Sequence, residues 1–126
     1  MNRLFLLLTV LLLVSCKEEA PKGPLYPNAK PEAQTPDQLG KEIFESKGNC
    51  FACHKPDQKI IGPSLQEIAK TYKDKKGDIV SFLKGNEEPL VDPEQFPVMK
   101  TNFAITKSMS DEELKALEAY IYSNLK

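Results

Sequence analysis

The sequence has no excess of charge of either sign, with 17 Lys and Arg side chains against 18 Asp and Glu in 126 residues. Proteins that bind nucleic acid usually present a strongly basic surface, so this balance argues against that class. The composition, 28% charged and 40% apolar, also excludes an acidic disordered chain. A chain of this length fits one compact domain rather than two.

Long hydrophobic runs are absent as well. The most apolar segment, Leu4 to Val14, has eleven residues and is broken only by Thr9. A helix rises about 1.5 Å per residue, so this segment cannot cross a hydrocarbon core about 30 Å thick. We therefore interpret residues 1–15 as the signal peptide of an exported protein.

Cys16 directly follows this apolar segment. Leu13-Val14-Ser15-Cys16 resembles the bacterial lipobox, in which the cysteine is acylated and the peptide is cleaved just before it. The resemblance implies a lipid on Cys16, and the alternative is an ordinary signal peptide followed by an incidental cysteine. Four prolines between residues 17 and 34 predict an extended tether, so that residues 16–34 connect the lipid to a domain over residues 35–126.

No stretch of the sequence shows the apolar and polar alternation of a β-strand, and no internal repeat is present. The domain instead begins with a helix signal. Thr35 and Gln38 form a capping-box pattern with a proline between them, which predicts a helix from Pro36 to Ser46 or Lys47.

A second capping box marks the other end of the domain. Ser110 and Glu113 predict the start of a final helix, with an apolar stripe along its length. Shorter helices are predicted after Pro63 and over residues 78–84. The fold class is therefore predicted to be all-α.

Histidine and cysteine are scarce and clustered. The only histidine and the two cysteines beyond Cys16 lie together in Cys50-Phe51-Ala52-Cys53-His54. This spacing matches covalent haem attachment, in which each cysteine forms a thioether and His54 coordinates the iron. Two neighbouring thioethers hold the porphyrin edge, so the next side chain is brought under the metal. The pattern predicts one covalently bound haem c.

Three other interpretations of this motif remain. A closed zinc site needs four ligands, and the domain has only two cysteines and one histidine. A thioredoxin-like redox pair is expected after a strand of an α/β sheet, for which the sequence shows no pattern. A plain disulfide would need no histidine and would close only a four-residue loop.

Further segments around the motif belong to a known pattern. They are Gly40-Lys41-Glu42-Ile43-Phe44, then Ile61-Gly62-Pro63-Ser64-Leu65, then Met99, then Ser110-Asp111-Glu112-Glu113-Leu114 running into Ala119-Tyr120-Ile121. Together with the motif they resemble the class I c-type cytochromes over nearly all of Thr35 to Lys126. The resemblance implies four to five short helices wrapped around one haem, with the terminal helices packed together where Gly40 and Phe44 meet Tyr120. It also implies that the Pro63 carbonyl accepts a hydrogen bond from the far nitrogen of His54.

The second axial ligand of the iron cannot be a histidine of this chain, because His54 is the only one. A methionine is the expected ligand, and an open or Lys-bound site is the alternative. The resemblance favours Met99, because the family places its axial methionine in a loop about ten residues ahead of the final helix. Met109 directly precedes the cap of that helix, where a packing role is expected. Lys100 follows Met99, where the family often has proline.

The sequence thus predicts a membrane-tethered carrier of single electrons in a respiratory chain of the bacterial periplasm, and not an enzyme. Its expected partners are a redox oxidase, reductase or dehydrogenase, and the membrane through the lipid on Cys16. The alternatives are a fixed subunit of a larger complex, or a haem sensor or peroxidase with an open site if Met99 does not bind. The resemblance also implies a rim of lysines around the haem edge, which is expected to guide an acidic partner; the alternative is a solvated face that serves solubility. The rim comprises Lys47, Lys55, Lys59, Lys100 and Lys107. The predicted core comprises Phe44, Phe51, Leu65, Ile68, Tyr72, Phe82, Leu83, Phe103, Leu114, Leu117 and Ile121.

Overall fold

The computed structural model describes residues 33–126, which form one compact unit from Ala33 to Lys126. The predictions for the signal peptide, for Cys16 and for most of the tether lie outside the described residues.

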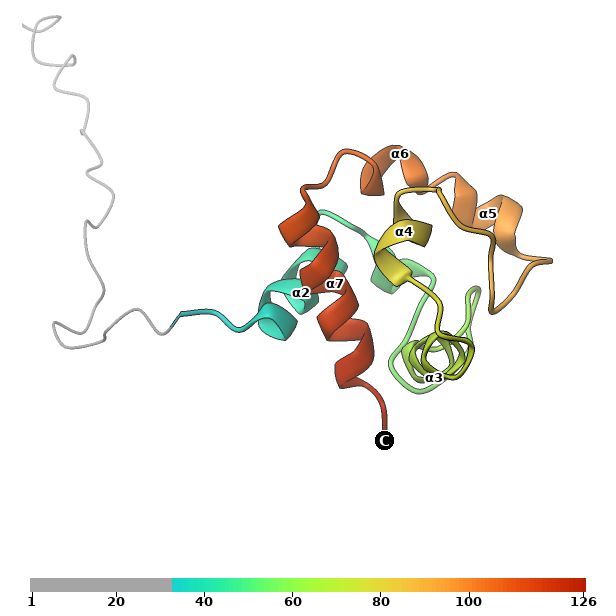
Figure 1. Cartoon of the computed structure of the whole chain (residues 1–126), viewed down its shortest axis with the longest axis horizontal. Helices are drawn as coiled ribbons and strands as arrows, with labels where there is room; N and C mark the ends of the chain where they lie inside the picture. Colours follow the sequence, from blue (N-terminus) through green and yellow to red (C-terminus); the bar gives the residue numbers. More distant parts are fainter. Residues whose placement is uncertain (1–32) are drawn as a thin grey trace, which may run out of the picture. The chain divides into compact units, whose positions relative to one another are not determined.

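The elements of the described part are helical, and it contains no strand beyond one isolated bridge. The prediction of an all-α fold is confirmed. The elements are α2 (Pro36–Glu45), the short 3-10 turn η2 (Cys50–Ala52), α3 (Leu65–Lys75), α4 (Ile79–Leu83), α5 (Phe96–Lys100), α6 (Phe103–Thr106) and α7 (Asp111–Ser123) (Figure 1).

Helices α2 and α7 lie side by side and cross closely (Figure 1). Gly40 makes this possible, because a Cβ at that position would lie 1.9 Å from the backbone oxygen of Ala116. Beside this contact the rings of Phe44 and Tyr120 meet edge to face, with their centroids 5.3 Å apart. The packing of the two terminal helices at Gly40 is as the resemblance predicts.

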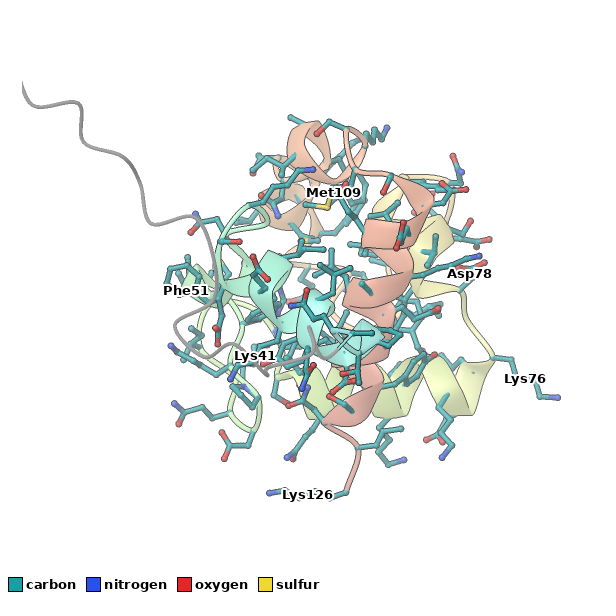
Figure 2. All side chains as sticks on the ribbon, turned by 90° about the vertical axis from the view of Figure 1, so that its left-hand side faces the viewer. Lys41, Phe51, Lys76, Asp78, Met109 and Lys126 are labelled. Atoms are coloured by element: carbon teal, nitrogen blue, oxygen red, sulfur yellow. The ribbon has the colours of Figure 1, made fainter. Side chains whose placement is uncertain are left out.

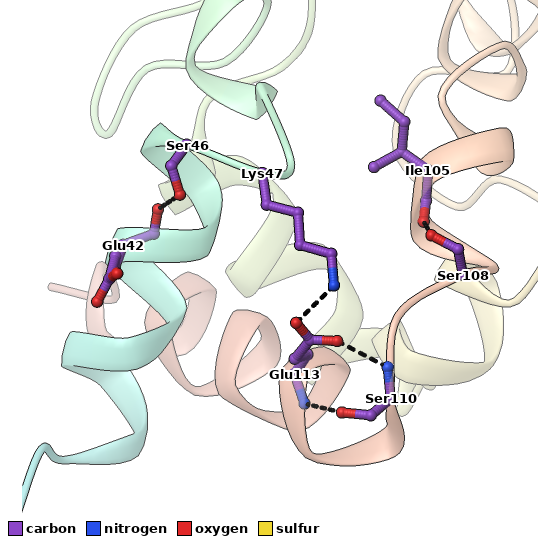
Figure 3. Close-up of polar contacts among 7 residues, drawn as sticks. All are labelled: Glu42, Ser46, Lys47, Ile105, Ser108, Ser110 and Glu113. Atoms are coloured by element: carbon purple, nitrogen blue, oxygen red, sulfur yellow. Dashed lines mark hydrogen bonds and ion pairs between the residues drawn. The ribbon is translucent and has the colours of Figure 1, made fainter.

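The start of α7 is joined to the end of α2 by Glu113. Its carboxylate accepts a hydrogen bond from the Ser110 backbone amide at 2.8 Å and from the Lys47 ammonium at 2.6 Å (Figure 3). The Ser110 hydroxyl accepts from the Glu113 amide at 3.2 Å, which completes the predicted capping box. Serine hydroxyls also bind backbone carbonyls just after α2 and α6. The Ser46 hydroxyl donates to the Glu42 carbonyl, and the Ser108 hydroxyl donates to the Ile105 carbonyl (Figure 3).

The shorter helices are also capped by side chains. Ser64 accepts from the Glu67 amide at 3.1 Å at the start of α3, and Asp78 accepts from the Ser81 amide at 2.7 Å at the start of α4. Helix α6 was not predicted, because it has only four residues. It is attached to α4 by the buried hydroxyl of Thr106, which donates to the Leu83 carbonyl at 2.7 Å.

The prediction that Phe51 belongs to the core is wrong, because its side chain is 43% exposed. Phe51 lies in the 3-10 turn η2, between Cys50 and Cys53, and points outward near the edge of the domain in Figure 2, whereas both cysteines line an apolar cleft. Two other members of the predicted core, Ile68 and Phe82, are only half-buried. The rest are buried: Phe44, Leu65, Tyr72, Leu83, Phe103, Leu114, Leu117 and Ile121.

None of the helices in the described part of the chain is long and apolar enough to span a membrane.

Candidate functional site

An apolar cleft of about 1300 Å³, counted with its open mouth, lies among η2, the helices α3 to α5 and the inner face of α7. Its lining includes Cys50, Cys53 and His54 of the motif, and residues 61–63 and Leu65 of the segment that follows. Residues 89–92 and α5 line the cleft as well, and Leu117 and Ile121 of α7 add apolar side chains to it. The predicted motif therefore faces a hydrophobic space rather than solvent.

His54 is oriented by a hydrogen bond to the segment that follows it. Its Nδ1 atom lies 2.7 Å from the carbonyl oxygen of Pro63. Since a carbonyl can only accept, Nδ1 carries the proton and the lone pair is left on Nε2. Burial lowers the pKa of His54, against a smaller opposing effect of the Pro63 carbonyl, and so favours the neutral imidazole that metals bind.

The Pro63 carbonyl is itself held in place by the backbone. The Gly62 amide donates to the Cys53 carbonyl at 2.8 Å, and the Leu65 amide donates to the Lys55 carbonyl at 2.9 Å. Glycine is required at position 62, because a Cβ there would lie 2.5 Å from Cε1 of His54. The segment Gly62-Pro63 thus fits closely around the imidazole.

Cys50 and Cys53 line the cleft and do not form a disulfide. Burial raises the pKa of the Cys50 thiol to about 11, so that this thiol is neutral at ordinary pH. A redox-active cysteine pair instead needs a thiol whose pKa is lowered. Within residues 33–126, no three His, Cys, Asp or Glu side chains gather as possible ligands of a metal ion.

The two methionines of the domain lie in different environments. Met99 is partly buried and lines the cleft, whereas Met109 is only 7% exposed and packs in the hydrophobic core. Met99 is therefore the methionine that lines the same cleft as His54.

The prediction that Met99 lies in a loop is wrong, because Met99 is part of the helix α5. Pro97 occupies the first turn of this helix, where its missing amide is tolerated. A proline at position 100 would disfavour the helical conformation of Met99, and Lys100 removes that restriction. Lys100 in place of the family's proline is thus compatible with the helical conformation of Met99.

Sequence reasoning missed an aromatic cluster beside the cleft. Phe82 lies at its centre, with ring centroids 6.1, 6.0 and 5.5 Å from those of Tyr72, Phe96 and Phe103. Tyr72, Phe82 and Phe96 also line the cleft. These side chains come from α3, α4, α5 and α6, and no local pattern in the sequence predicts that they meet.

Comparison with known proteins agrees with this site. A sequence model of the cytochrome c family matches residues 38–124. Cytochrome c-551 of Pseudomonas denitrificans is 31% identical over 90 residues, which cover 65% of this chain and 93% of that protein. Cytochrome c-552 of Nitrosomonas europaea is 46% identical over 39 residues, which cover 31% of this chain and 37% of that protein. Cytochrome c2 of Rubrivivax gelatinosus is 53% identical over 32 residues, or 25% of this chain and 38% of that protein.

The chain belongs to the cytochrome c family, as a class I c-type cytochrome. The cofactor of this family is covalently bound haem c, and Cys50 and Cys53 have the spacing of its attachment motif. The residues present fit that group, because the cleft combines two reduced thiols, an imidazole with a free Nε2 lone pair and an apolar lining. Family membership supports the function of an electron carrier.

Proposed function

We propose that this protein carries single electrons through a haem c that is attached to Cys50 and Cys53 and ligated by His54 and Met99. The observation that supports this proposal is the position of all four side chains on the lining of one apolar cleft. When bound, haem c supplies an iron that takes up and releases one electron between its ferric and ferrous states.

The residues of the chain have separate roles in this proposal. The Pro63 carbonyl accepts a hydrogen bond from Nδ1–H of His54, which keeps the imidazole in one tautomer and leaves the Nε2 lone pair free to bind the iron. The thioether of Met99 would favour the ferrous state, and the apolar lining of the cleft would keep water away from the iron. If His54 and Met99 both held the iron, no ligand position would be left for a substrate, which would suit a carrier rather than an enzyme.

The ligation can be tested by comparing two methionine variants. Met99→Ala should abolish the weak long-wavelength absorption band of Met-ligated ferric haem and should open the iron to added imidazole. Met109→Ala should keep this band, because Met109 packs in the core away from the cleft. The opposite pattern would assign the ligand to Met109. A wild-type protein without the band would indicate a Lys-bound site or an open site, of which the open site would suit sensing or peroxide chemistry.

The proposed function includes a place in the cell. Residues 1–15 act as a signal peptide, Cys16 carries the lipid, and residues 16–34 tether the haem domain of residues 35–126 in the bacterial periplasm. Cys16→Ala should give a misprocessed protein without an acyl group, measured by intact mass, while the haem domain still folds. A wild-type protein that is freely soluble in the periplasm and lacks acyl mass would contradict the lipid anchor.

The predicted docking surface for redox partners is a rim of five lysines. Two of them form ion pairs within the chain, Lys47 with Glu113 and Lys59 with Asp92. Ile61 and Val98, which line the cleft, are 56% and 52% exposed. We therefore propose that an oxidase, reductase or dehydrogenase of the respiratory chain docks on apolar side chains at the mouth of the cleft, with charge in a secondary role.

A further inference from the structure

One ion pair connects the loop after His54 with the part of the cleft lining that precedes α5. The ammonium of Lys59 lies 2.7 Å from Oδ2 of Asp92, 33 residues further along the chain. Lys59 belongs to the loop that follows His54, and Asp92 belongs to the segment before α5. The Asp92 side chain is only 18% exposed and lines the cleft.

The second oxygen of Asp92 contacts the start of α5. Its Oδ1 accepts from the Gln95 amide at 3.4 Å, and the Gln95 carbonyl accepts from the Met99 amide at 3.3 Å. On the other side of the ion pair, an isolated antiparallel bridge pairs Lys59 with His54. A continuous series of contacts therefore runs from His54 through Lys59, Asp92 and Gln95 to Met99.

Helix α5 needs such an attachment for a physical reason. It has five residues, and none of them is buried. A helix this short is not stable by itself, so its position depends on contacts with the rest of the domain. The packing of Phe96 against Phe82 and Phe103 holds one side of α5. The Asp92 carboxylate holds its beginning.

We propose that Lys59 and Asp92 form a clasp that holds α5, and with it Met99, against the cleft. The two side chains are positioning residues for the axial ligand. The proposal rests on the proposed function, because it takes Met99 as the ligand of the iron. The clasp acts on the rate at which Met99 leaves the iron and returns to it.

Both partners carry their charges in the folded protein. The hydrogen bond from Lys59 lowers the pKa of Asp92, and the same bond raises the pKa of Lys59. An ion pair near the surface is weakened as dissolved salt shortens the screening length from about 30 Å at 0.01 M to about 8 Å at 0.15 M. The clasp should therefore loosen as ionic strength rises.

The test uses ferric holoprotein and added imidazole, which binds the iron only after Met99 has left. Lys59→Gln and Asp92→Asn should each accelerate imidazole binding about 1.5- to 5-fold at low salt, as expected for a partly exposed pair. The double variant should match the singles rather than multiply them, because both changes break one interaction. Lys59→Arg, which preserves charge and reach, should keep the wild-type rate.

Lys70→Gln is the matched control, because it removes a lysine from an exposed ion pair with Asp74 on α3. It should leave the imidazole rate unchanged. Rates of Lys59→Gln and Asp92→Asn equal to those of wild type and Lys70→Gln would overturn the clasp and leave the proposed function intact. A wild-type protein without the long-wavelength Met band would overturn the ligation by Met99, and the clasp with it.

Discussion

The crossing of α2 and α7 gives a prediction whose size follows from the structure. Gly40→Ala would place a Cβ 1.9 Å from the backbone oxygen of Ala116 and 2.8 Å from Cβ of Tyr120. Ordinary contact begins at 3.4 Å, so the two helices would have to separate by about 1.5 Å at this point. The obstacle is backbone, which cannot rotate away as a long side chain can.

Two opposing effects set the size of the change in stability. Overpacking a close contact destabilises a protein by about 1–3 kcal/mol, and a backbone clash belongs at the upper end of that range. Alanine is the better helix former by about 1 kcal/mol, which offsets part of this loss. We expect a net destabilisation of about 2 kcal/mol, which lowers the melting temperature of a domain this size by about 8–16 °C.

The assay is thermal unfolding of the haem-loaded protein, followed by far-ultraviolet circular dichroism. Lys41→Ala is the matched control, because Lys41 neighbours Gly40 on α2 but is exposed, with a side chain that makes only a distant pair with Glu45. It should change the melting temperature by no more than about 3 °C. A Gly40→Ala protein as stable as wild type would refute the argument that the helix crossing requires glycine.

Three further predictions concern the site and its surroundings. Cys50→Ser combined with Cys53→Ser should give a chain without covalent haem and without cooperative unfolding, because the cofactor fills the apolar cleft; intact mass and calorimetry measure this, and a well-folded colourless domain would contradict it. Gly62→Ala should displace the His54 imidazole, because the new Cβ would lie 2.5 Å from Cε1, and should change the ferric absorption spectrum more than Gly40→Ala does. Met109→Ala should destabilise the protein by about 2–5 kcal/mol, as expected when a buried methionine is truncated. Thermal unfolding checks this value, and a loss below about 1 kcal/mol would show that the core repacks around the missing side chain.

The parts of this protein that local sequence determined are those whose signal lies within a few residues. The capping boxes at Thr35 and Ser110 start α2 and α7 where their patterns predict, because a cap acts only on its own first turn. The attachment motif Cys50–His54 needs no distant partner to bring its three side chains together. The all-α fold class followed from helical periodicity and from the lack of alternation.

Other features were decided only by the tertiary structure, because their partners are distant in the sequence. Nothing near Thr106 predicts its hydrogen bond to Leu83, and nothing near Phe51 predicts that its side chain is exposed while Cys50 and Cys53 line the cleft. The pairing of Lys59 with Asp92 spans 33 residues. Charge patterns along a chain show which side chains can pair, but only the folded backbone decides which of them come within reach. The position of α5, and with it of Met99 on the cleft, therefore belongs to the fold rather than to the sequence around it.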